Sequence, residues 1–338
     1  MSKRGSLKVA VLATLVGVAL LFAVCGGKAY AADKKIRVGT QFNITNPPKA
    51  GGWDRADWPG IEYMRKVLGW EVSVAEGVPY PQSASIAAGY AEKGYDIVVF
   101  PDNGMIEAFK SVPAQYPKTW FIMTSGTDAL PDAEKVAAWV PDFYVYGNMV
   151  GVVAALASKS GVIGVSGGVP IPVLLQMYSG IIEGAKAVRP SVKVDVSWVG
   201  DWVDLPKHKE VTNLQIQNGA DVIFTVTGPG TTGVFEAAEQ GGAKCIGYAA
   251  DWYADAPKAV MTSVLIDKAQ MYKDLGEKFL KGTLKKQIYP VGANFFKLAD
   301  FHGSLNSQTI AKIQEVVKNL QTGKLKIPVV MHPEIEKK

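Results

Sequence analysis

The sequence predicts an α/β protein built from two similar, doubly wound lobes with a cleft between them. Short β-rich runs alternate with longer amphipathic runs, which is the rhythm of βαβ units on a parallel sheet. The pattern then repeats, because Gly94–Phe100 (Gly-Tyr-Asp-Ile-Val-Val-Phe) resembles Gly219–Thr225 (Gly-Ala-Asp-Val-Ile-Phe-Thr), 125 residues later. The same offset joins two further pairs of expected strands, Arg37 with Val162 and Trp120 with Cys245.

In the first half, apolar runs predict strands and the stretches between them predict helices. The expected strands are Ile36–Gln41, Glu71–Ala75, Asp96–Phe100 and Thr119–Met123. The expected helices are Asp57–Leu68, Ser83–Lys93 and Met105–Tyr116. The run from Ile97 to Phe100 is apolar on both faces, as a sheet covered by helices on both sides requires.

The second half predicts the same series. The expected strands are Val162–Ser166, Val192–Trp198, Asp221–Val226 and Cys245–Tyr248, and the expected helices are Pro172–Val188, Leu205–Gln217 and Thr231–Gln240. Two further helices, Lys268–Lys281 and Gln308–Leu320, and a strand at Asn294–Leu298 would complete both lobes. We therefore expect one lobe from residues 34–146 plus about 268–300, and the other from residues 147–267 plus about 301–330.

Residues 1–31 are predicted to be a secretory signal peptide. A basic start precedes the apolar run Val9–Val24, and Ala29-Tyr30-Ala31 places small residues at the two positions that an export peptidase reads. A membrane anchor is the first alternative, although a run of about 16 residues is shorter than the roughly 20 that a spanning helix needs. The second alternative is a lipoprotein with Cys25 lipidated, for which Val24 is a poor preceding residue.

Charge and cysteine content exclude several classes of protein. The signal segment holds four basic and no acidic residues, so its removal lowers the formal net charge from +5 to +1. We therefore expect neither nucleic acid nor an anionic membrane as a partner. Only Cys245 remains, so no intrachain disulfide is expected, and its apolar surroundings indicate a buried, inert thiol.

The candidate ligand-binding residues follow the predicted strands, because ligands of such sheets bind beyond the carboxyl ends of the strands. In the first lobe these are Phe42, Asn43, Trp53, Asp54, Asp102, Asn103 and Ser125. In the second lobe they are Gly167, Trp202, Thr227, Gly228, Asp251 and Trp252. Aromatic faces beside a few acceptors suit a flat, polar-edged ligand such as a purine, or a sugar ring. Packing beneath a loop is the alternative for any single tryptophan, and Trp58 is expected to face the core.

Catalytic and metal sites find little support. His208, His302 and His332 never share a metal-ligand spacing, and His208 is expected at a solvated helix start. There is no phosphate loop that ends in Gly-Lys-Ser/Thr. Asp54 is expected to be a loop residue or a helix cap. No cofactor and no metal are expected, and the protein is not expected to be an enzyme.

Four stretches together suggest a family by their order and spacing. They are Gly147–Lys159 (Gly-Asn-Met-Val-Gly-Val-Val-Ala-Ala-Leu-Ala-Ser-Lys), Gly164–Pro172, Gly219–Phe224 and Gly233–Ala238. From about Lys35 to Pro328 the chain resembles the basic membrane protein group of ABC-transporter substrate-binding proteins, of the purine-nucleoside receptor type. The resemblance implies the type I periplasmic-binding-protein fold, a periplasmic location, and delivery of a small molecule to a membrane permease. A monomer is expected.

The resemblance also implies part of a binding site. A stacking phenylalanine followed by asparagine in the family corresponds here to Trp53 and Asp54, and a second stacking aromatic corresponds to Trp202. The family's late aspartate matches Asp251, and an acidic residue near the ribose aligns with Glu107. A purine held between Trp53 and Trp202, one from each lobe, is the resulting expectation.

One departure from the family concerns the sugar. Nucleoside-binding members hold the ribose with a lysine at the position where this chain has Ile266. Loss of a charged donor would cost about 1.5–3 kcal/mol if nothing replaced it. We therefore expect a free purine base or a related flat heterocycle. A nucleoside receptor of the same type, a ligand-binding subunit of a membrane sensor and a periplasmic enzyme acting on nucleosides remain the alternatives.

Overall fold

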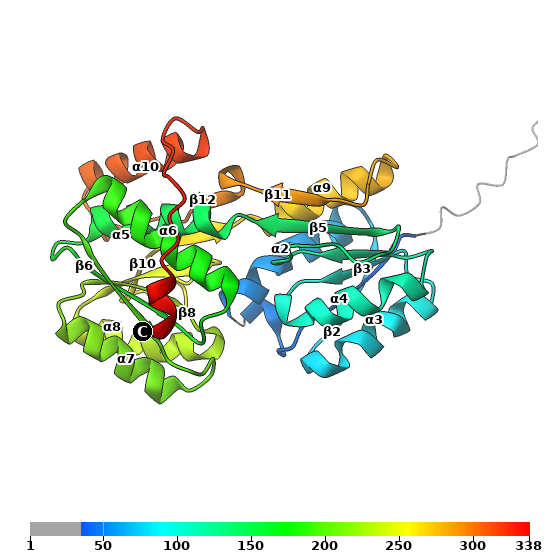
Figure 1. The fold of residues 1–338 in the computed structure, drawn as a ribbon, viewed down its shortest axis with the longest axis horizontal. Helices are drawn as coiled ribbons and strands as arrows, with labels where there is room; N and C mark the ends of the chain where they lie inside the picture. The colour runs from blue at the N-terminus through cyan, green and yellow to red at the C-terminus, as the bar shows by residue number, and fades with distance from the viewer. Residues whose placement is uncertain (1–34, 50) are drawn as a thin grey trace, which may run out of the picture. The chain divides into compact units, whose positions relative to one another are not determined.

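The computed structural model describes residues 35–49 and 51–338, so the predicted signal peptide and Cys25 lie outside the described residues. Residues Ile36–Lys338 form one unit that contains two six-stranded sheets, one in each lobe (Figure 1). Within the described part of the chain, no helix has both the length and the apolar character needed to cross a membrane.

The first sheet has the strand order β11-β5-β4-β3-β1-β2, and all its pairs are parallel. Its strands are β1 (Arg37–Gln41), β2 (Glu71–Ala75), β3 (Ile97–Phe100), β4 (Trp120–Met123), β5 (Val136–Pro141) and β11 (Ile288–Val291). Alternate residues of β3 enter different cores. Ile97 and Val99 pack on the side of helices α2 (Gly52–Lys66) and α9 (Lys268–Leu280). Val98 and Phe100 pack on the side of α3 (Ser83–Glu92) and α4 (Ile106–Ser111).

The second sheet has the order β12-β10-β9-β8-β6-β7. Its strands are β6 (Val162–Gly167), β7 (Lys193–Trp198), β8 (Val222–Val226), β9 (Lys244–Ala249), β10 (Val260–Ile266) and the antiparallel edge strand β12 (Phe296–Leu298). Its helices are α5 (Phe143–Ala157), α6 (Pro172–Val188), α7 (Leu205–Gln217), α8 (Thr231–Gly241) and α10 (Ser307–Gln321).

The two strand orders confirm the predicted duplication and fold class. The order β5-β4-β3-β1-β2 in one lobe matches β10-β9-β8-β6-β7 in the other, strand for strand. Only the edge strands differ, since β11 is parallel to its neighbour and β12 is antiparallel. Each sheet therefore presents the carboxyl ends of five equivalent parallel strands at one edge, where doubly wound folds bind ligands.

The lobe boundaries differ from those expected. The predicted change of lobe after residue 146 falls inside α5, which packs on α6 and α10 of the second lobe. Phe296–Leu298 pairs with β10 and therefore belongs to the second sheet, not to the first lobe. The chain thus crosses between the lobes near Asp142, near Asp267 and between β11 and β12. Four elements, β5, α5, β10 and β11, are not among the expected strands and helices.

Two predicted helices also differ. The first helix begins at Gly52, five residues before the expected Asp57, so Trp53 and Asp54 are helical and Asp54 accepts no capping bond. The expected helix Met105–Tyr116 is only α4 flanked by 3-10 turns, because Pro113 has no N–H to continue it.

Candidate functional site

A cavity of about 570 Å³ lies between the carboxyl ends of the two sheets, and both lobes line it. This volume is in the range of small-molecule sites. Ten of the thirteen predicted residues line it. They are Asn43, Trp53, Asp54, Asp102, Asn103, Ser125, Trp202, Thr227, Gly228 and Trp252.

The remaining three predicted residues lie outside the cavity wall. Phe42 is fully buried in the core beneath it. Gly167 serves packing, since a Cβ there would lie 2.6 Å from the ring of Trp198. The carboxylate of Asp251 turns to its own lobe, where its Oδ1 accepts hydrogen bonds from the Tyr253 N–H at 3.1 Å and the Ser263 hydroxyl at 3.2 Å.

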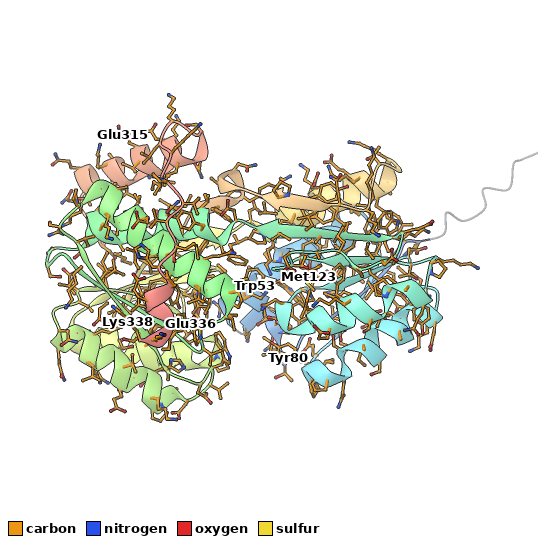
Figure 2. The ribbon with its side chains drawn as sticks, viewed as in Figure 1. Trp53, Tyr80, Met123, Glu315, Glu336 and Lys338 are labelled. Atoms are coloured by element: carbon orange, nitrogen blue, oxygen red, sulfur yellow. The ribbon has the colours of Figure 1, made fainter. Side chains whose placement is uncertain are left out.

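Trp53 stands in the first turn of α2, where the first lobe faces the second (Figure 2). Its indole N–H donates to the carbonyl of Pro101, just after β3, at 2.8 Å. The ring of Tyr248 from the second lobe is nearly parallel to it, with an interplanar angle of 13° and centroids 6.3 Å apart. Phe143 lies 5.8 Å away, tilted by 39°. Trp53 is therefore held by its edge within a group of aromatic rings.

Trp202 and Trp252 line the cavity from the second lobe. The Trp202 ring lies against Gly168, where a Cβ would approach to 2.4 Å, so only glycine permits this placement. Trp252 is nearly buried and packs edge-on against Phe235. Its indole N–H donates to the Tyr248 carbonyl at 3.0 Å. Trp252 is thus partly structural, whereas Trp202 has its ring at the cavity wall.

Two carboxyl groups of the first lobe also line the cavity. Asp54 has a buried Oδ1 with no hydrogen-bond partner among the described residues, and burial, with Asp102 and Asp57 nearby, raises its pKa to about 7. Burial also raises the pKa of Asp102, although the Gly104 N–H at 2.6 Å and the Tyr80 hydroxyl donate to it. The site therefore offers an unsatisfied acceptor to a ligand that carries N–H or O–H donors.

Several lining residues were missed. Tyr80 follows β2 at an interval that the strand-end rule could have found, and Asn43 Nδ2 donates to its hydroxyl at 2.9 Å. Tyr248 was counted as a strand residue, and Phe143 begins a helix that was not predicted. The apolar side chains of Ile171, Val173 and Leu174 complete the wall near the start of α6.

Two expectations outside the cavity are corrected. Glu107 is exposed on α4 and pairs with Lys110 at 3.1 Å, so it does not reach the cavity. His208 is fully buried instead of solvated, because Gly230 leaves room for its ring and its Nε2 lies 2.9 Å from the Asp201 carbonyl. Burial lowers the pKa of His208.

A fully buried ion pair lies next to the cavity. Lys268 Nζ donates to Asp57 Oδ2 at 2.6 Å, and both side chains have no exposed surface. The Tyr272 hydroxyl donates to the other carboxylate oxygen at 2.9 Å. No pattern in the sequence connects α2 with α9, so this pair could not have been predicted. Within residues 35–49 and 51–338, no group of three or more His, Cys, Asp or Glu residues could hold a metal ion.

Comparison with known proteins identifies the family. Residues 44–320 match the family described as ABC transporter substrate-binding protein PnrA-like (Bmp). A purine-binding protein of Brucella abortus is 29% identical over 330 residues, covering 94% of this chain and 90% of the relative. An ABC transporter nucleoside-binding protein of Lactococcus lactis is 26% identical over 216 residues, covering 61% of this chain and 59% of the relative.

A solved structure supports the fold independently. An ABC transporter solute-binding protein from Conexibacter woesei has a TM-score of 0.74 and 22% identity, and the match covers 88% of this chain and 100% of that one. The family match spans most of the chain and includes both lobes. The chain therefore belongs to the Bmp family of PnrA-like ABC transporter substrate-binding proteins.

Proposed function

We propose that this protein binds a free purine base, or a related flat heterocycle, between Trp53 and Trp202 and delivers it to an ABC permease. The observation that carries the proposal is the composition of the cavity wall. Aromatic rings come from both lobes, and Asp54 Oδ1 is a buried acceptor without a partner. A flat ring with N–H donors on its edge satisfies both features. Relatives described as purine-binding and nucleoside-binding support the same ligand class.

The base is favoured over the nucleoside by the residues near the end of β10. Ile266 is buried and does not line the cavity. Lys268, two residues further on, is paired with Asp57 and does not line it either. No lysine is therefore available at this strand end to hold a ribose. The nucleoside remains the second candidate, because a cavity of about 570 Å³ has room for a sugar beside the base.

The protein acts as a monomeric carrier outside the cytoplasm and releases its ligand unchanged. An exported location agrees with the predicted signal peptide and with the role of the family. A turnover assay with nucleosides separates this function from catalysis, since a carrier returns intact ligand. A sensor subunit of the same fold would bind the same ligand and would act without the permease.

A thermal-shift screen of the refolded, ligand-free protein tests the proposal. The panel holds purine bases, nucleosides, pyrimidines, flavins and simple sugars. A ligand at 100 times its Kd adds about 2.7 kcal/mol to the free energy of unfolding. We expect purine bases to stabilise the protein more than their nucleosides do. Stabilisation by nucleosides alone would support the second candidate, and stabilisation by sugars alone would overturn the purine proposal.

Variants assign the site. Trp53→Ala and Trp202→Ala should each weaken purine binding by roughly 5- to 150-fold, since base–aromatic stacking contributes about 1–3 kcal/mol per base. Trp58→Phe is the matched control, because Trp58 lies on the same helix but does not line the cavity. Unchanged affinity in both alanine variants would remove the stacking role.

A further inference from the structure

The cavity has features that would suit a cation as well as a neutral heterocycle. Aromatic rings and carboxylates together are the usual wall of a site for organic cations. Here Trp53, Phe143 and Tyr248 stand beside Asp54 and Asp102. Something in the site must therefore set its preference for ligand charge.

Lys268 is positioned to set the preference of the cavity for ligand charge. Its ammonium lies 3.4 Å from the centroid of the Trp53 ring, which is direct contact. Lys268 is fully buried and does not line the cavity, whereas Trp53 does. The ammonium therefore covers one face of the indole from the buried side of the site. Nζ also lies 3.5 Å from the Trp53 carbonyl oxygen.

The surroundings of Lys268 keep this charge in place. Both oxygens of Asp57 accept hydrogen bonds, from Lys268 at 2.6 Å and from Tyr272 at 2.9 Å, as an ionised carboxylate does. Lys268 and Tyr272 lie one turn apart on α9, and both donate hydrogen bonds to Asp57 of α2. Gly60 makes room for the Tyr272 ring, since a Cβ there would come within 2.1 Å of it. The charge in contact with the indole is thus positive, and its counter-ion is held by two donors.

We propose that Lys268 is a specificity-determining residue, which makes Trp53 select neutral rings over organic cations. The ammonium already uses the attraction of the indole for a positive charge, and it repels a second cation on the opposite face. A neutral, polarisable ring stacks on the same face without that repulsion. This inference deepens the proposed function and rests on it only for the identity of the stacking ligand.

A matched pair of ligands tests the inference. 9-Methyladenine is neutral, whereas 1,9-dimethyladeninium, which has one more methyl group, is cationic at pH 7. We expect the wild type to prefer the neutral compound at pH 7. The Lys268→Met/Asp57→Asn double variant removes both buried charges together, so no unpaired carboxylate remains to unfold the protein. The ratio of the two Kd values should then shift toward the cation by roughly tenfold.

The control separates charge selection from simple packing. Tyr272→Phe removes one hydrogen bond of Asp57 but leaves the ammonium, so it should lower the Tm and leave the ratio of Kd values within twofold. A double variant that loses affinity for both compounds equally would overturn the inference, because a loosened pocket weakens both ligands alike.

If neither adenine derivative binds, the role of Lys268 can still be tested with an organic cation that is not a purine. That result would refute the proposed function. Trimethylphenylammonium would then be tested in a thermal-shift assay on the wild type and on the double variant. Stabilisation of the double variant alone supports the role of Lys268, and an equal response of both proteins refutes it.

Discussion

At the residue scale, the carboxyl group of Asp54 is the polar group of the cavity with the most consequences for binding and stability. It lies in the first turn of α2, where the helix dipole favours a negative charge. Burial and two neighbouring carboxyls outweigh this and raise its pKa from 3.8 to about 7. The folded state therefore binds more protons than the unfolded state between about pH 4 and pH 7, so this group makes the free energy of unfolding fall as pH rises through that range.

Asp54→Asn should remove that pH dependence. The amide keeps the shape of the side chain and cannot ionise, so the variant should be more stable than the wild type at pH 8, by up to about 4 kcal/mol. The difference should shrink toward pH 4.5, where the folded wild type is protonated. Chemical denaturation at several pH values measures it. Parallel stability profiles of the two proteins would contradict the assignment.

At the element scale, the pair α5 and α6 shows how glycines set the distance between helices. A Cβ at Gly147 would lie 2.0 Å from the Met177 carbonyl oxygen, and a Cβ at Gly151 would lie 2.1 Å from the Ile181 carbonyl oxygen. On the facing helix, a Cβ added at Gly180 would lie 2.2 Å from the Tyr144 carbonyl oxygen. The glycines in the family-like stretch thus have a packing role, and the backbones touch.

Gly147→Ala should destabilise the protein by about 1–3 kcal/mol or more, because a backbone oxygen cannot move aside as a flexible side chain can. Gly89→Ala is the matched control. Gly89 is also helical but has nothing within 4 Å of an added Cβ, so it should gain about 0.5–1 kcal/mol from alanine. Urea denaturation of both variants gives the comparison, and equal effects would contradict the packing role.

At the scale of the whole molecule, contacts near the cavity join the lobes. Arg55 of α2 donates two hydrogen bonds to Asp255 of the second lobe, at 2.7 and 3.2 Å, and its guanidinium lies 4.3 Å from the centroid of the Trp252 ring. Gly52 of the same helix meets the Tyr248 carbonyl so closely that a Cβ would lie 2.0 Å from it. Because Trp252 and Tyr248 line the cavity, the contacts that join the lobes adjoin the proposed ligand site.

Asp255→Asn should weaken this closure more than it weakens folding. A surface ion pair contributes only about 0–1 kcal/mol, so the Tm should change little. The dissociation rate of a bound purine base should rise a few-fold, since the lobes separate more readily. Stopped-flow displacement measures that rate. Glu236→Gln breaks an ion pair with Lys209 inside the second lobe and should leave the rate unchanged. Equal rates in all three proteins would show that the Arg55 contact does not hold the lobes.

Much of the fold followed from local patterns. Three elements have the predicted bounds: the helices Pro172–Val188 and Leu205–Gln217 and the strand Glu71–Ala75. Their bounds could be predicted because apolar periodicity depends on neighbouring residues. The strand-end rule also brought most candidate residues to one cavity. It failed for Phe42 and Gly167, whose burial depends on packing from elsewhere in the chain. It also failed for Asp251, whose carboxylate accepts hydrogen bonds within its own lobe.

The sequence by itself determined the repeated α/β lobe, its apolar strands and the sheet edge where the cavity lies, since each of these follows from residue order over short distances. Only the tertiary structure decided that Asp57 pairs with Lys268, 211 residues away, that Arg55 reaches Asp255, and that Phe296–Leu298 joins the second sheet. Buried charges and edge strands need partners, and a partner from another lobe or helix leaves no periodic trace in the sequence.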